Sequence, residues 1–273
     1  MSASHQTLVR QQFDRQVTHY LASSAMADRG LIEAIVAAAP VLPGQRVLDV
    51  GCGAGFLLRA YREAGAEVFG VDLSEAMLRE AGKTLGSSVP PDHLLPGDAA
   101  HLPFDGETFD VVTCKLAMHY FPEPHRAIEE MARVCRRSGL VALIDRVACD
   151  DPGLCAEQNR LEKLRTPNKV RVYTEGELAD MLARAGMTVV RRELMIQPMD
   201  FEEWMAAAGA LDRAAQPRDL LIGPNGEDRT GLTPHEGVGG LVIHHRTLIL
   251  VADAGKGKSG GRPRPPTGPP AAA

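Results

Sequence analysis

Short apolar runs alternate with amphipathic stretches along most of the chain, and this rhythm predicts its secondary structure. Compact runs rich in β-branched residues predict buried strands, and apolar residues at helical spacing predict helices. The expected strands lie near residues 46–50, 67–71, 92–96, 109–114, 139–145, 187–193 and 242–252. The expected helices lie near residues 54–64, 74–84, 124–136 and 175–185. Strands that alternate with helices predict a mostly parallel sheet with helices on both faces, which is an α/β fold.

Three further segments stand outside this rhythm. Residues 1–40 predict a helical cover in two pieces, the second of which ends at Pro40. Residues 146–173 and 194–240 form connections of a length that is usually functional or carries its own structure. We expect both connections to form a lid over the substrate. The alternative is a structural decoration, or a dimer contact through Trp204, the only tryptophan.

The first expected strand leads into a glycine turn. Gly51, Gly53 and Gly55 lack Cβ atoms, so a ligand can approach the backbone closely at the start of the next helix. The following strand ends in Asp72, about 20 residues after the first glycine, where an acid holds ribose hydroxyls in nucleotide-binding folds. The pattern predicts a nucleoside site, although the glycines alone also suit a tight turn without a ligand.

The spacing of the turn distinguishes between cofactors. Phe56 follows Gly55, so the G-x-G-x-x-G fingerprint of dinucleotide-binding proteins is not met, which weighs against an NAD oxidoreductase. Residues 47–55 instead resemble V-L-D-[VIL]-G-C-G-x-G, the first motif of class I S-adenosylmethionine-dependent methyltransferases. The later motifs of that family also have similar segments in this chain, in the same order. These segments are residues 70–74, 97–104, 109–112 and 133–140. The resemblance covers roughly residues 13–252 and is nearest to the ubiquinone/menaquinone C-methyltransferase-like small-molecule group.

The resemblance implies a fold and a domain organisation. The fold would be a Rossmann-like seven-stranded sheet, mostly parallel with an antiparallel last strand, with helices on both faces and a helical lid. One domain would extend over residues 1–254. Residues 255–273 are rich in Gly and Pro and are expected to be disordered, because they cannot bury enough apolar surface to fold.

The resemblance also implies S-adenosylmethionine as cofactor and a set of residues that would hold it. Backbone groups of Gly51, Cys52 and Gly53 would line the methionine part, and Asp72 would accept the ribose hydroxyls. The other expected cofactor-binding residues are Leu73 on the adenine, Asp98 and Ala99 at the adenine amino edge, Lys115 through its backbone, and Tyr20 near the sulfonium. An aromatic face beside a sulfonium would be favourable as a cation–π contact.

The sequence indicates less clearly which residues would bind and activate the methyl acceptor. His119 is the candidate general base, because histidine titrates near neutrality; a structural role is the alternative. Residues 159–171 resemble the family pattern N-x-[IL]-E-[RK]-L-R-D-P-S-H-[VT]-R, but 166–169 lack its Asp, Ser and His. The expected substrate-binding residues are Asn159, Arg171 and Tyr173. Arg171 would pair with an anionic group of the substrate or cofactor, unless it is a surface arginine.

Composition narrows the remaining possibilities. The chain has 273 residues, 44% of them hydrophobic, and a net charge of −5, which weighs against a nucleic-acid partner. It shows neither a signal-peptide pattern nor an apolar run of membrane-spanning length, so we expect a cytoplasmic protein. Five cysteines without a C-x-x-C pair suggest neither disulfides nor zinc. His244 and His245, as strand neighbours, point to opposite faces and cannot chelate one ion, so no metal is expected.

The expected function is therefore methyl transfer from S-adenosylmethionine to carbon or oxygen of a quinone, phenolic or polyketide-like small molecule. The amino-methyltransferase signature [DN]-P-P-[YFW] is absent after the fourth strand, which disfavours nucleic-acid or protein amides. The alternative is a regulatory or structural protein that keeps the cofactor fold without catalysis. A monomer or a homodimer is expected.

Overall fold

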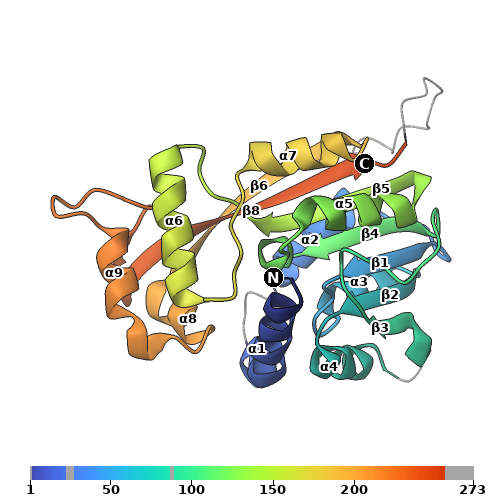
Figure 1. The fold of residues 1–273 in the computed structure, drawn as a ribbon, viewed down its shortest axis with the longest axis horizontal. Coiled ribbons are helices and arrows are strands. Elements are labelled where there is room, and N and C mark those ends of the chain that lie inside the picture. The colour runs from blue at the N-terminus through green and yellow to red at the C-terminus, as the bar shows by residue number, and fades with distance from the viewer. Residues whose placement is uncertain (1, 23–27, 87–88, 256–273) are drawn as a thin grey trace, which may run out of the picture.

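The computed structural model describes residues 2–22, 28–86 and 89–255, and a single mixed sheet lies at its centre. Its strands are β1 (Arg46–Val50), β2 (Glu67–Asp72), β3 (Leu94–Pro96), β4 (Phe109–Lys115), β5 (Cys135–Arg146), β6 (Thr188–Asp200), β7 (His235–Gly237) and β8 (Gly240–Asp253). The order is β3-β2-β1-β4-β5-β8-β6, and β7 pairs separately with β8 (Figure 1).

The strand directions confirm a mostly parallel sheet with an antiparallel last strand. From β3 to β5 all neighbours pair in parallel, whereas β8 runs antiparallel between β5 and β6. The expected count of seven strands is wrong. Within the described residues the sheet has eight strands, because β7 turns back on the start of β8 as a short hairpin arm.

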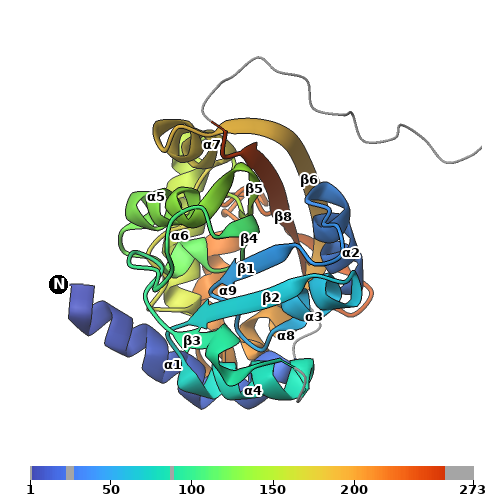
Figure 2. The ribbon, with the colours of Figure 1, turned by 90° about the vertical axis from the view of Figure 1, so that its right-hand side faces the viewer.

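Helices cover both faces of the sheet. The helices are α1 (Ser2–Ala22), α2 (Arg29–Ala38), α3 (Phe56–Glu63), α4 (Glu75–Leu85), α5 (Pro124–Val134), α6 (Pro152–Arg165), α7 (Glu175–Arg184), α8 (Phe201–Ala206) and α9 (Ala215–Leu221). Figure 2 shows α2 and α3 on one side of the sheet, and α5 and α7 on the other. Alternate residues of β5 divide between the two cores: Val141 and Leu143 pack toward α5 and α7, and Ala142 and Ile144 toward α2 and α3.

Strands β6 and β8 are longer than the pattern predicts. They stay paired as far as Asp200 and Val242, beyond the end of the parallel sheet. There they carry α6, α8 and α9, which share a third core that includes Leu161, Phe201 and Leu221 (Figure 1). Trp204 is only 5% exposed within this core, so its suggested role as an exposed dimer contact is wrong. We call α6, α8, α9 and the outer ends of β6 and β8 the cap.

The N-terminal helices have different positions. Helix α2 packs on the sheet through Leu31 and Ile35, which is the expected cover. Helix α1 lies instead beside the gap between the sheet and the cap (Figure 1). In the described part of the chain, no helix combines the length and the apolar character needed to cross a membrane. The predicted disordered tail lies outside the described residues apart from Gly255.

Candidate active site

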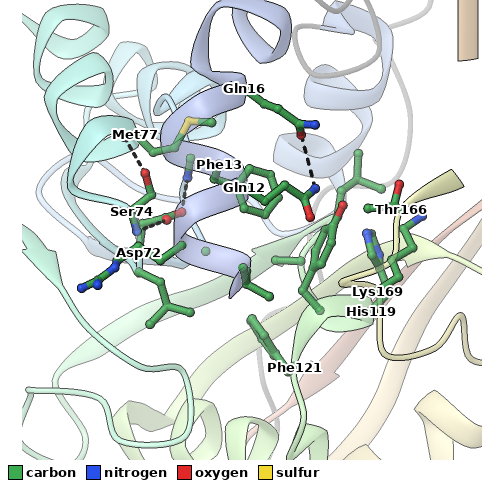
Figure 3. A pocket seen from close by; sticks show the side chains of 18 of the residues that line it. Gln12, Phe13, Gln16, Asp72, Ser74, Met77, His119, Phe121, Thr166 and Lys169 are labelled. Carbon is green, nitrogen blue, oxygen red and sulfur yellow. Dashed lines mark hydrogen bonds between the residues drawn. The ribbon is translucent and has the colours of Figure 1, made fainter. Parts of the chain in front are cut away.

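A cavity of about 600 Å³ lies between the carboxyl ends of the parallel strands, α1 and the cap. Its volume falls in the range of small-molecule sites. One side, the sheet half, is formed by residues that follow β1, β2, β3 and β4. The other side, the cap half, is formed by residues of α6, α8, β8 and the turn Met118–Tyr120. Figure 3 shows side chains of α1 between Asp72 of the sheet half and His119 and Lys169 of the cap half.

The glycine turn of the sheet half can be built only from glycine at its critical position. Gly51 has a φ of 73°, and a Cβ atom there would lie 2.7 Å from the Cβ of Ala117. The Gly51 N–H donates to the carbonyl of Val71 at 2.8 Å, so the turn is fixed to the end of β2. The backbone of Gly51 and Gly53 consequently borders the cavity without side chains in the way.

Asp72 is fixed at the opposite edge of this turn. One carboxylate oxygen accepts the Gly53 N–H and the other accepts the Ser74 N–H, both at 2.9 Å. Burial raises the pKa of Asp72, while these two hydrogen bonds act in the opposite direction. The carboxylate is therefore oriented in advance, with its remaining acceptor capacity on the cavity side.

Asp98 and Ala99 complete the sheet half. Asp98 accepts the N–H of Ala100 at 3.0 Å, and its other oxygen accepts the side-chain amide of Gln6 from α1 at 2.6 Å. Leu73 lines the cavity between Asp72 and Asp98. Two carboxylates and an apolar side chain thus border the same cavity, a combination that suits a nucleoside.

A buried polar pair supports the floor of the turn. Asp49 is 1% exposed and accepts the hydroxyl of Thr113 at 2.7 Å. Burial raises the pKa of Asp49 to about 7, against the opposing effects of Thr113 and Lys115. Burial lowers the pKa of Lys115, which lines the cavity, and Asp49 opposes that shift.

His119 forms a buried pair with Asp145 at the boundary of the two halves. The distance from its Nδ1 to Asp145 Oδ1 is 2.5 Å, and its backbone N–H donates to the other oxygen at 3.2 Å. A carboxylate can only accept here, so Nδ1 carries the proton and Nε2 is left as an acceptor. Burial lowers the pKa of His119, while Asp145 raises it. The ring is thus neutral near pH 7 and can take up a proton.

Aromatic side chains enclose the cap half. The rings of Phe13 and Tyr120 meet edge-to-face at 5.1 Å, and the Tyr120 ring lies 4.5 Å from that of His119. On the far wall, Trp204 lies 5.4 Å from His245. All five side chains line the cavity.

Helix α1 is hydrogen-bonded to both halves. Besides the bond from Gln6 to Asp98, Asp14 accepts the hydroxyl of Ser74 at 2.6 Å on the sheet side. On the cap side, Gln16 donates to the carbonyl of Ala208 at 3.1 Å. The helix therefore closes the cavity from outside.

The comparisons with known proteins identify the family. A family model described as "Methyltransferase domain" matches residues 48–143. The chain is 32% identical over 173 residues to the uncharacterized methyltransferase YcgJ of Bacillus subtilis, covering 63% of this chain and 68% of that protein. The chain belongs to the class I S-adenosylmethionine-dependent methyltransferases. The methyltransferase therefore uses S-adenosylmethionine, and the oxidoreductase and non-catalytic alternatives are not supported.

Other similarities are more partial. The crystal structure of a putative methyltransferase from Bacillus halodurans superposes with a TM-score of 0.73 at 23% identity, over 82% of this chain and 98% of that one. A ubiquinone biosynthesis O-methyltransferase of Azoarcus sp. is 39% identical over 101 residues, which are 37% of this chain and 43% of that protein. Apart from YcgJ, the methyltransferase spans between 40% and 60% of the length of its first curated relatives.

The structure brings most of the expected cofactor-binding residues to one cavity. These are Gly51, Gly53, Asp72, Leu73, Asp98, Ala99 and Lys115. Cys52 is the exception, because its thiol packs where a Cβ of Gly70 would stand and its N–H donates to Val71. The side chain of Tyr20 lies outside the described residues.

The expected substrate-binding residues Asn159, Arg171 and Tyr173 are not among the residues that line the cavity, and their role stays a prediction. The amide of Asn159 is used locally: it accepts the N–H of Val172 at 2.7 Å and donates to that residue's carbonyl at 3.1 Å. Arg171 pairs with Glu177 at 2.7 Å on a partly exposed surface. Tyr173 belongs to the core beneath the sheet.

Other side chains line the cap half of the cavity, and the sequence interpretation missed them. The cavity is lined by Arg146 at the end of β5, by Glu162 and Arg165 on α6, and by His245 on β8. Asp145 contacts His119 and is not itself a lining residue. Thr166 and Lys169 line it too, and both stand where the chain departs from the family pattern. That departure was the signal available for Thr166 and Lys169.

Proposed function

We propose that this methyltransferase transfers the methyl group of S-adenosylmethionine to an acidic hydroxyl of a small molecule, with His119 as general base. The observation that supports this most directly is the His119–Asp145 pair, whose histidine borders the same cavity as the glycine turn. A base is needed only when the acceptor must lose a proton, as a phenol or an enol does.

The cofactor fits the sheet half by its chemistry. Gly51 and Gly53 would face the methionine part, because their backbone borders the cavity without side chains. Position 51 accepts only glycine, because a Cβ atom there would collide with Ala117. Asp72 would accept the ribose hydroxyls, and Asp98 the adenine amino group, with Leu73 against the ring. When bound, S-adenosylmethionine supplies an electrophilic methyl carbon on a sulfonium, which keeps the electron pair of the broken bond.

His119 and Asp145 would then manage the proton. Nε2 of His119 takes the hydroxyl proton while the acceptor oxygen bonds to the methyl carbon. Asp145 holds the ring by its Nδ1 and stabilises the imidazolium that results. The conjugated carbon of the same anion is a second possible position for the methyl group, and the product distinguishes the two.

The cap and α1 would exclude water and hold the two reactants in line. Residues 146–173 and 194–240 supply Lys169 and Trp204 to the wall, in keeping with a lid role for both segments within one domain of residues 1–254. Positioning of this kind is a large part of catalysis when two substrates react. The aromatic lining favours a flat apolar acceptor.

Two further inferences concern the class of acceptor and the cellular compartment. The ubiquinone biosynthesis O-methyltransferase of Azoarcus sp. bears on the acceptor, because its name connects this family to quinone-related small molecules. The five cysteines are free, which suits a reducing compartment such as the cytoplasm. A monomer or homodimer stays a prediction.

The test is methyl transfer from isotope-labelled S-adenosylmethionine to a panel of catechols, hydroxybenzoates and hydroxyquinones. We expect wild-type turnover of at least one member, and a fall of about 100- to 10,000-fold in kcat for His119→Ala with unchanged affinity for S-adenosylhomocysteine. His244→Gln, the neighbour on β8 outside the cavity, is the matched control. Full activity of the His119 variant would refute the assigned base.

A further inference from the structure

Four basic side chains gather on the wall of the cap half. Arg146 ends β5, Arg165 ends α6, Lys169 follows α6, and His245 lies on β8. All four line the cavity. Lys169 is 5% exposed and His245 is 2% exposed, so this is an interior surface. We call these four residues the basic wall.

The acids near the basic wall are already engaged. Glu162 accepts Lys169 Nζ at 2.7 Å. Burial raises the pKa of Glu162, but Lys169 and Arg165 outweigh it and bring the pKa to about 2. Asp145 accepts two N–H groups of His119 and the N–H of Arg146. Among the described residues that line the cap half, Glu162 is the one buried acid against three permanent cations.

Two polar atoms of the basic wall have no partner among the described residues. They are Nη1 of Arg146 and Nε2 of His245, and both are shielded from solvent. A buried polar group without a hydrogen bond costs about 1–3 kcal/mol, and more when it is charged. Arg165, by contrast, is held by the carbonyl of Trp204 at 2.8 Å and lies over its ring at 4.6 Å. Arg146 therefore presents a donor that an anionic ligand can satisfy, and His245 presents a second one in the tautomer that carries its proton on Nε2.

We propose that the basic wall binds a carboxylate of the methyl acceptor, so that the acceptor is an aromatic acid with its hydroxyl toward His119. This inference rests on the proposed function. The guanidinium of Arg146 suits the two oxygens of a carboxylate, and His245 supplies a further contact. The surrounding rings of Phe13, Tyr120 and Trp204 suit a flat body between carboxylate and hydroxyl.

The charge count favours a monoanion. Glu162 and Asp145 are the acids that act most strongly on Arg146, and together they balance two of the three cations, whereas Asp28 acts more weakly. The surplus is thus small, and a doubly charged phosphate would bury more charge than the wall compensates. A carboxylate matches the surplus.

Three fragments test the proposal on the protein saturated with S-adenosylhomocysteine: benzoate, benzamide and phenyl phosphate. They share the ring, which carries a planar monoanion in benzoate, a planar neutral amide in benzamide and a larger tetrahedral anion in phenyl phosphate. We expect benzoate to bind about 10- to 100-fold more tightly than benzamide, the usual strength of a hydrogen bond to a charged group, and more tightly than phenyl phosphate. Titration calorimetry or ligand-observed NMR measures the three affinities.

Variants assign the effect to the basic wall. Arg146→Met should reduce benzoate affinity about 10-fold or more and leave benzamide affinity unchanged. Arg160→Met on α6 is the matched control, since Arg160 is exposed and lies outside the cavity. Affinity for S-adenosylhomocysteine reports whether each variant folds. If Arg146→Met does not fold, two measurements still decide whether the basic wall binds a carboxylate. They are the ranking of the three fragment affinities on the wild-type protein and the benzoate affinity of Arg146→Lys, which keeps the charge.

Each other outcome overturns the inference. Equal affinity for benzoate and benzamide, tighter binding of phenyl phosphate, absence of binding by all three, or an unchanged Arg146→Met protein contradicts a carboxylate site. These measurements involve no methyl transfer. A negative result therefore leaves His119 and the proposed reaction standing, whereas an inactive wild type with normal benzoate binding would refute the reaction alone.

Discussion

Replacing Asp145 by Asn tests how the candidate base is held. The carboxylate is 2% exposed and accepts three N–H groups: Nδ1 of His119 at 2.5 Å, the backbone of His119 at 3.2 Å and the backbone of Arg146 at 2.7 Å. An asparagine keeps the shape, loses the charge and turns a donor toward one of these N–H groups. We therefore expect a loss of stability of about 1–3 kcal/mol with the fold retained.

The kinetic effect follows from the lost charge. Opposite charges about 4 Å apart interact by about 4 kcal/mol at an effective dielectric constant of about 20. If half to all of the proton charge has reached His119 in the transition state, about 2–4 kcal/mol of stabilisation disappears, which is roughly 30- to 1,000-fold in kcat. Because Asp145 raises the pKa of His119, the substitution should lower that pKa further.

Two measurements check the Asp145→Asn prediction. Single-turnover methyl transfer to the best acceptor of the phenol panel gives the rate, and an NMR titration of the His119 imidazole gives the pKa without any acceptor. Asp151→Asn is the matched control, because this residue caps α6 outside the cavity and asparagine caps a helix equally well. An unchanged rate together with an unchanged His119 pKa would refute the role of the pair.

Three further predictions follow from the same contacts. Because burial holds the pKa of His119 below its ordinary value of about 6.5, kcat/KM should fall only as the pH drops through that lowered pKa, where the ring becomes protonated and cannot act as a base. Asp72→Asn should weaken S-adenosylhomocysteine about 10- to 100-fold in calorimetry, since a charge-assisted hydrogen bond is lost. Gln6→Ala should tighten S-adenosylhomocysteine about 2- to 10-fold, because Gln6 occupies an oxygen of Asp98 that the adenine amino group would use.

Each of these predictions has a control and a contrary result. The fall of kcat/KM at low pH should persist in His244→Gln. If the same fall also persisted in His119→Ala, its assignment to His119 would be contradicted. Asp92→Asn, which changes an exposed acid outside the cavity, should bind S-adenosylhomocysteine normally, and unchanged affinity in Asp72→Asn would contradict the ribose site. Gln11→Ala on the outer face of α1 should also be neutral, and weaker binding by Gln6→Ala would show that α1 supports the cofactor.

The sheet half could be predicted because its signals are local. The apolar run before Gly51 predicts a strand, and Gly51 itself predicts a turn, because glycine tolerates positive φ. The structure shows both. Parallel strands place their carboxyl ends at one edge, so Asp72 and Asp98 had to converge there with the glycines. No distant contact was needed for that part of the interpretation.

The cap half depends on contacts between distant segments, and no spacing rule gives them. Asp145 meets His119 across 26 positions, and His245 reaches the wall only because β8 extends into the cap. One signal was available: His245 shares its strand face with the apolar Leu241 and Ile243, so alternation already pointed it inward. For Asn159 and Arg171 the family pattern gave the segment but not the direction of each side chain.

The most direct test of the account is a crystal structure of the protein with S-adenosylhomocysteine. The account predicts ribose hydroxyls on Asp72, adenine beside Leu73 and Asp98, and a sulfur atom that faces His119 across the cavity. A nucleoside bound in the cap half, or a sulfur separated from His119 by protein, would contradict it.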